Sequence, residues 1–170
     1  MLKLIGALLL TGGGFVLGMA ASGTLADRVR GLSALTAALE LLERELSFRL
    51  PPMPDLLEGL ARRAPAPADR FFAKCAKGLD ELGEKPFDQI WSEALSGAPM
   101  GLNAEDAALL GELGGVLGRY DGEGQRQAVA QTRARLTERL QEARDERRRQ
   151  GRVYGTLGTA LGAFCTILLL

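Results

Sequence analysis

The side chains that most often carry out catalysis are scarce in this sequence. There is no histidine, which removes the commonest general base and the commonest metal ligand. The two cysteines, Cys75 and Cys165, form no C-x-x-C pair, and we interpret both as apolar packing residues of a reducing compartment. Neither a G-x-x-x-x-G-K-S/T phosphate loop nor a G-x-S-x-G nucleophile turn is present. We therefore predict no enzymatic activity, no cofactor and no metal site.

The one concentrated group of charges is a basic run near the end of the sequence. Most carboxylates lie three or four residues from an arginine on predicted helices, which is typical of solvated helix faces. The basic run is different because it directly precedes a stretch without charge. Arginines beside a membrane attract anionic headgroups, and this reading is more economical than nucleic-acid binding, which we do not predict. The predicted headgroup contacts are Arg144, Arg147, Arg148, Arg149 and Arg152.

Two apolar stretches flank the middle of the chain. Residues 4–26 carry no charged side chain, and neither do residues 153–170. A helix rises about 1.5 Å per residue, so each stretch is long enough, or nearly so, to cross the hydrocarbon layer of about 30 Å. We predict transmembrane helices over residues 1–23 and 153–170, around a helical domain of residues 24–152. G-x-x-x-G spacings at Gly14–Gly18 and Gly158–Gly162 are typical of close helix packing in lipid.

The first stretch also fits a second interpretation, a cleaved signal peptide. Lys3, the apolar run and the small residues Ala20, Ala21 and Ser22 match that pattern. Export would leave the basic run on the outer side of the second span, against the positive-inside tendency. Counting Lys and Arg near the spans gives ten on the domain side against one, Lys3, on the other. The charge asymmetry therefore favours a cytoplasmic domain.

The middle of the chain reads as about six helices without strands. Seven apolar residues from Leu25 to Leu46 recur at spacings of three and four over residues 24–49, which predicts a long amphipathic helix. Prolines and glycines then separate helices predicted over 55–63, 69–82, 86–96 and 103–120. Asn103 is the expected N-cap of the fourth of these. After a turn at residues 121–124, a long helix over 125–150 is expected to pack on the first and to form a stalk with it.

The helix predicted over 103–120 contains four glycines, at positions 111, 114, 115 and 118. Each glycine weakens a helix by about 1 kcal/mol relative to alanine. We expect close packing to offset this loss of helix stability, with the helix either in the centre of the domain or against one neighbour.

Several segments together resemble the stage III sporulation protein AB family of endospore-forming bacteria. The opening residues 1–7, the Leu50-Pro51-Pro52-Met53-Pro54 segment after a leucine-periodic helix, and the Trp91-Ser92-Glu93-Ala94-Leu95 stretch are similar to the family pattern. The most specific match is L-G-x-x-D-x-x-x-Q, formed here by Leu117, Gly118, Asp121 and Gln125. This resemblance covers essentially the whole chain.

The resemblance implies a fold and a function beyond what the residues themselves indicate. It implies a helical cytoplasmic domain similar to that of type II secretion F platform proteins. It also implies membership of the membrane complex between mother cell and forespore, with a hexameric secretion-type ATPase, stage III sporulation protein AA, and other membrane subunits as partners. The candidate motif residues carried over are Trp91, Leu117, Gly118, Asp121 and Gln125. The alternative function is a lipid-associated structural anchor without an ATPase partner.

Overall fold

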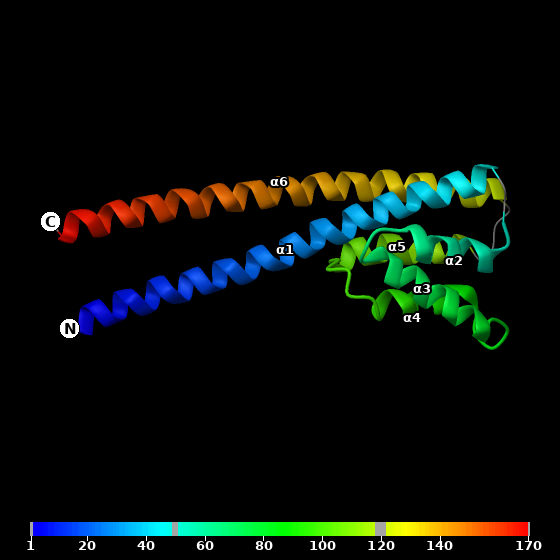
Figure 1. Ribbon diagram of the computed structural model, residues 1–170, viewed down its shortest axis with the longest axis horizontal. Coiled ribbons are helices and arrows are strands. Elements are labelled where there is room, and N and C mark those ends of the chain that lie inside the picture. The colour runs from blue at the N-terminus through cyan, green and yellow to red at the C-terminus, as the bar shows by residue number, and fades with distance from the viewer. Residues whose placement is uncertain (1, 49–50, 118–121, 170) are drawn as a thin grey trace.

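The computed structural model describes the backbone of residues 2–48, 51–117 and 122–169, and the side chains of residues 23–48, 51–117 and 122–150. Over these residues the chain is all-helical and contains no named strand, so the all-helical part of the predicted fold class is confirmed. The elements are α1 (Leu2–Phe48), α2 (Met53–Arg63), α3 (Ala68–Gly78), the 3-10 turn η1 (Leu79–Glu81), α4 (Phe87–Ser96), α5 (Ala104–Leu117) and α6 (Gly122–Leu169) (Figure 1).

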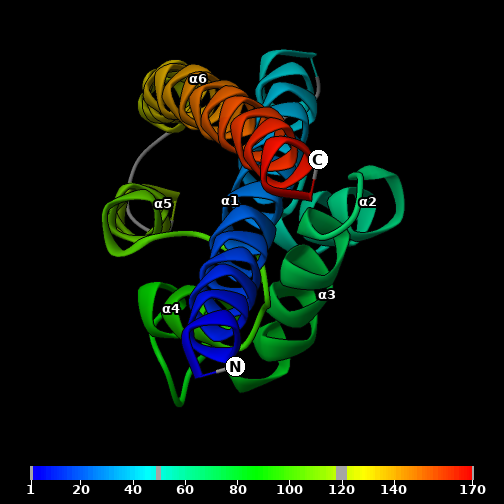
Figure 2. The ribbon, with the colours of Figure 1, turned by 90° about the vertical axis from the view of Figure 1, so that its left-hand side faces the viewer.

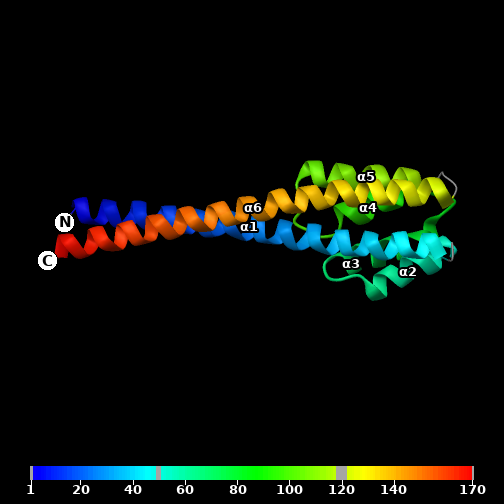
Figure 3. The ribbon, with the colours of Figure 1, turned by 90° about the horizontal axis from the view of Figure 1, so that it is seen from above.

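The two long helices α1 and α6 pack along each other and leave the short helices at the same end. Both chain termini therefore lie on one side of the molecule (Figures 1 and 3). The expected packing of the first and last long helices is confirmed, and the α6 backbone is uninterrupted at Gly151. The predicted spans at 1–23 and 153–170 lie almost wholly outside the residues whose side chains are described. Among the described residues, no helix combines the length and apolar character needed to cross a membrane.

Helix α1 occupies the middle of the helical domain. Viewed along the long axis, α2 and α3 lie on one side of it, α4 and α5 on the other, and α6 above (Figure 2). Its predicted leucine stripe is buried from Leu25 to Leu46, and Ala34 and Ala38 are buried with it. The buried surface is wider than the predicted stripe because helices cover α1 on more than one face.

Prolines and glycines set most helix boundaries, with local differences from prediction. Helix α2 begins at Met53, two residues before the predicted start, because Pro54 is tolerated in a first helical turn. The helix predicted over 69–82 ends at Gly78 and continues as η1, after which Gly83 adopts a positive φ of 118°. The predicted turn at 121–124 is wrong from Gly122 onward, where α6 has already begun.

An aromatic cluster joins α3 and α4. Trp91 is fully buried, and its ring lies 4.7 Å from that of Phe71 in an edge-on arrangement. Phe72 and Phe87 complete the cluster at 6.1 Å and 5.8 Å from Trp91. Edge-on aromatic pairs add about 0.5–1.5 kcal/mol beyond the area they bury. The cluster fixes the face of α4 that supports α5.

Candidate functional site

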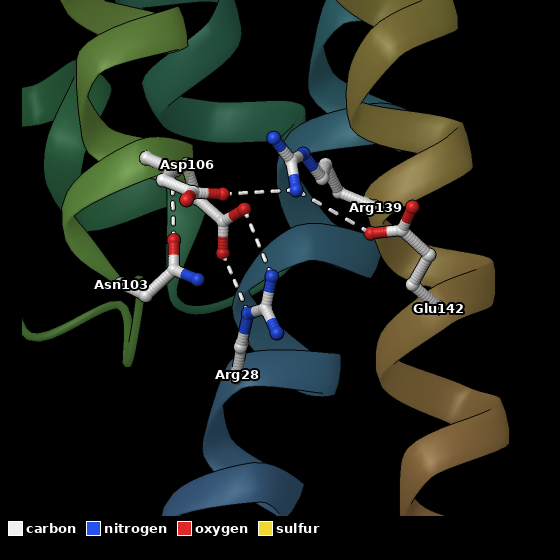
Figure 4. Close-up of polar contacts among 6 residues, drawn as sticks. Arg28, Asn103, Asp106, Arg139 and Glu142 are labelled. Carbon is white, nitrogen blue, oxygen red and sulfur yellow. Dashed lines mark hydrogen bonds and ion pairs between the residues drawn. The ribbon is translucent and has the colours of Figure 1, made fainter.

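The most elaborate polar arrangement among the described residues lies where the start of α5 meets the two long helices. Arg28 of α1 donates from Nε to Asp106 Oδ2 at 2.7 Å and from a terminal nitrogen to Oδ1 at 3.1 Å. Figure 4 shows this two-point contact between α1 and α5. Such forked pairs are stronger and more directional than single hydrogen bonds. We call Arg28, Asn103, Asp106, Glu105 and Arg139 the polar junction.

The local sequence of α5 holds the acceptor in place. The Asn103 Oδ1 atom accepts a hydrogen bond from the Asp106 backbone N–H at 2.8 Å, so the predicted N-cap is confirmed. Asp106 thus occupies the first turn of α5, where the helix dipole favours a negative charge. Its side chain is fully buried, whereas that of Arg28 is 15% exposed.

Charge pairing has a clear effect on Arg28. The hydrogen bond that Arg28 donates to Asp106 raises the pKa of Arg28, and the more distant carboxylates Glu146 and Glu142 of α6 add to the effect. On the outer side of the junction, Arg139 of α6 contacts Glu105 of α5 at 2.9 Å and Glu142 at 3.5 Å. The junction therefore joins α1, α5 and α6 through opposite charges.

The loop before α5 lies directly against α1 because two glycines allow a close approach. A Cβ on Gly31 would overlap the carbonyl oxygen of Met100 and lie 3.0 Å from its carbonyl carbon. Gly101 has a positive φ of 66°, and a Cβ there would lie 2.8 Å from the Asp27 backbone. This backbone contact sets the position from which Asn103 and Asp106 reach Arg28.

Metal ligands and cysteine thiols carry much protein chemistry, and both can be judged for the described residues. These residues include no group of three or more His, Cys, Asp or Glu side chains arranged to hold a metal ion. Cys75 is fully buried, and desolvation raises the pKa of its thiol to about 12, so its reactive thiolate is suppressed. This agrees with a packing role for Cys75. Cys165 lies outside the residues whose side chains are described.

The motif residues predicted from the sequence occupy two places. Trp91 is buried in the aromatic cluster, and its indole N–H donates to the Leu110 carbonyl of α5 at 2.8 Å. Leu117 and Gln125 come together, because the Gln125 side-chain amide donates to the Leu117 carbonyl at 2.9 Å. That carbonyl belongs to the last turn of α5, which lacks intrahelical partners. The first and last residues of the L-G-x-x-D-x-x-x-Q pattern thus link α5 to α6, while Gly118 and Asp121 lie outside the described residues.

The predicted headgroup contacts lie on the part of α6 near the diverging ends of the long helices. Arg144, Arg147, Arg148 and Arg149 are exposed there. Arg152 lies outside the residues whose side chains are described. Arg144 and Arg147 face a hollow that they share with Arg30 of α1.

Sequence reasoning missed the Arg28–Asp106 pair, although a signal was present. Asp106 shares a helical stripe with Leu110, Leu113 and Leu117 at spacings of four, three and four. Arg28 similarly lies within the apolar stripe of α1, between Leu25 and Leu32. A charged residue within a buried stripe requires a partner of opposite charge. The periodicity could have identified both residues, but not that they pair with each other.

Comparison with known proteins finds a family model and a solved structure that are similar to this chain. The family described as stage III sporulation protein AB matches residues 3–170. A solved structure of a stage III sporulation protein AB is similar in fold, with a TM-score of 0.63 and 22% sequence identity, over 72% of this chain and 97% of that chain. A search of curated proteins found no match.

Proposed function

From the premise that the chain belongs to the stage III sporulation protein AB family, and so has a role in sporulation, we propose that it is a non-catalytic platform subunit of the channel between mother cell and forespore. Residues 1–23 and 153–170 span the cell membrane, and residues 24–152 form a domain on the mother-cell cytoplasmic side. The domain docks a hexameric secretion-type ATPase, stage III sporulation protein AA, while the spans contact other membrane subunits.

The observation that carries this proposal is the direction of the two long helices. Both charge-free stretches, residues 4–26 and 153–170, continue helices that leave the domain at one end (Figure 1). Two adjacent spans of this kind place the domain on a single side of a membrane. The domain then presents its opposite end to the cytoplasm, which supports a docking role for that end.

The opposite end also carries exposed apolar side chains. Phe48 at the end of α1 is 85% exposed, and Leu82 in the turn between α3 and α4 is 57% exposed. The two residues lie on separate segments of this end, the end of α1 and the turn before α4 (Figure 1). Exposed apolar side chains are candidates for interaction sites, and aromatic residues are enriched among binding hot spots. We call Phe48 and Leu82 the distal apolar pair and propose it as the ATPase contact.

Co-purification of the ATPase with the full-length chain tests this proposal. The double substitution Phe48→Ser, Leu82→Ser is expected to weaken recovery of the ATPase about tenfold or more, as the loss of a hot spot does. Membrane insertion and helix content should not change, because neither side chain is in the core. A matched control is Ser47→Ala, Glu84→Gln, which alters exposed neighbours. Undiminished ATPase recovery with the double variant would refute docking at this end.

The second candidate function is a lipid-associated structural anchor without an ATPase partner. The cluster of exposed arginines at the end of the domain from which the long helices leave favours it. The triple substitution Arg147→Gln, Arg148→Gln, Arg149→Gln separates the two functions. An anchor loses membrane localisation while its protein partners still bind, whereas a docking platform depends on the distal apolar pair.

A further inference from the structure

A basic hollow of about 360 Å³ lies between α1 and α6 at the end of the domain nearest the apolar stretches. Three arginines line it, Arg30 on α1 and Arg144 and Arg147 on α6. Its apolar part is formed by side chains that include Ala34, Ala37 and Pro65. Residues more than 100 positions apart in the sequence thus bring three positive charges around one small hollow.

In this part of α6, basic and acidic side chains lie on different sides of the helix. Arg144 and Arg147 face this hollow, on the side of the loop between α2 and α3. Glu142 and Glu146 act instead on Arg28, and Glu146 lines a separate hollow with Asn103 on the α5 side. Glu142 and Glu146 are therefore turned away from the basic hollow.

The basic hollow continues into a second one. Arg30 and Ala66 belong to both, and the second adds Arg70 of α3 together with Asp27. Asp27 lies 3.4 Å from Arg30 across one helical turn and offsets part of its charge. Both carboxylate and guanidinium are well exposed, so this pairing is weak. Four arginines against one carboxylate leave the region strongly positive.

The class of ligand can be inferred from how close the hollow lies to the apolar stretches. Arg30 follows the first charge-free stretch by four residues, and Arg147 precedes the second by six. At about 1.5 Å per helical residue, the backbones of both arginines lie within about 10 Å of the proposed spans along the helix axes. A phosphodiester at the membrane surface is the anion that can reach them, since guanidinium groups match phosphate oxygens in pairs.

We propose that this hollow binds the headgroup of an anionic phospholipid. The phosphodiester lies between Arg30, Arg144 and Arg147, and the glycerol end lies toward Ala26 and Val29, which line the hollow on the side of the first apolar stretch. The inference rests on the proposed membrane attachment and deepens it, because it gives the headgroup a defined site and adds Arg30 to the arginines predicted from the basic run. Bound lipid would join α1 to α6 at the point where they leave the domain.

Lipid titration of the detergent-solubilised full chain, followed by native mass spectrometry, tests the proposal with phosphatidylglycerol as the probe. Each arginine near the surface contributes about fivefold in affinity, so Arg30→Gln, Arg147→Gln should weaken phosphatidylglycerol binding about 25-fold. Binding of zwitterionic phosphatidylcholine should not change. The matched control, Arg62→Gln, Arg126→Gln, removes two exposed and ion-paired arginines elsewhere and should bind like the wild type.

The possible results separate this inference from the proposed function. Equal phosphatidylglycerol affinity in the two double variants, with unchanged helix content, would overturn the hollow as the headgroup site while leaving membrane attachment intact. Displacement of the lipid by inorganic phosphate at equal concentration would overturn lipid recognition in favour of a free anion. Failure of the wild-type chain to insert into vesicles of either lipid would overturn both proposals.

Discussion

In the folded chain, the Asp106 carboxylate is surrounded by one guanidinium group and the first turn of a helix instead of by water. It is fully buried, and both of its oxygens accept hydrogen bonds from Arg28. A buried pair of this kind gains little over an apolar pair of the same size, but removal of one partner leaves an uncompensated charge. At the residue scale, the pair therefore selects which side chains of α1 and α5 meet and adds little to the free energy of unfolding.

The substitution Asp106→Asn tests this role. It keeps the side-chain volume but leaves Arg28 without its counter-charge, so we expect the free energy of unfolding to fall by about 3 kcal/mol. Urea unfolding of the full chain in detergent micelles, followed by circular dichroism, measures the change. The neighbouring Glu105→Gln removes an exposed partner of Arg139 and should cost less than about 1 kcal/mol.

The double substitution Arg28→Met, Asp106→Leu completes the comparison. Replacement of both charges by apolar groups of similar size is expected to cost much less than Asp106→Asn alone. Equal losses for the single and double variants would show that the two side chains contribute independently, against the pairing described above.

At the scale of elements, the stability of α5 depends on what surrounds its glycines. We expected close packing to compensate this helix, and of the three glycines whose surroundings are described only Gly114 faces a close neighbour. A Cβ on Gly114 would lie 2.5 Å from Cγ and 2.9 Å from Cβ of Trp91. Gly111 and Gly115 have open space where a Cβ would be added. Trp91 therefore determines how closely α4 approaches α5, and its hydrogen bond to the Leu110 carbonyl fixes the register.

Alanine substitutions distinguish these glycines by the sign of their effect. Gly114→Ala should lower the free energy of unfolding by about 1–3 kcal/mol, because the contacted Trp91 atoms lie near the backbone and cannot move aside freely. Gly111→Ala and Gly115→Ala should raise it by about 0.5–1 kcal/mol through helix propensity alone. Thermal unfolding of the three full-length variants, measured side by side, gives the comparison. Stabilisation by Gly114→Ala would mean that Trp91 does not pack against this position.

At the scale of the whole molecule, the proposed orientation depends on the shared direction of α1 and α6 (Figure 3). Single cysteines at the exposed positions Ala73 and Ser92 report on it, in a background where Cys75 and Cys165 are replaced by alanine. We expect protection from a membrane-impermeant maleimide in intact cells and labelling after permeabilisation, because the arginines beside both stretches favour the cytoplasmic side. Labelling of intact cells at both positions would reverse the orientation, as the signal-peptide alternative requires.

The sequence alone determined the features that depend on neighbouring residues. Proline and glycine positions located the breaks between helices, the leucine spacing identified the buried side of α1, and Asn103 was identified as an N-cap. The charge-free stretches and the basic run could also be recognised from the sequence. These features are local, because helix capping, helix termination and amphipathic periodicity act over one to a few turns.

Only the tertiary structure decided which distant residues meet. Arg28 and Asp106 are separated by 78 positions, and Arg30 reaches the same hollow as Arg144 and Arg147 only because α1 and α6 pack side by side. Periodicity shows that a side chain faces inward, but the partner depends on how helices are placed around α1. That placement depends on contacts between segments that are distant in the sequence. These contacts are the backbone approach at Gly31 and Gly101 and the ring of Trp91 against Gly114.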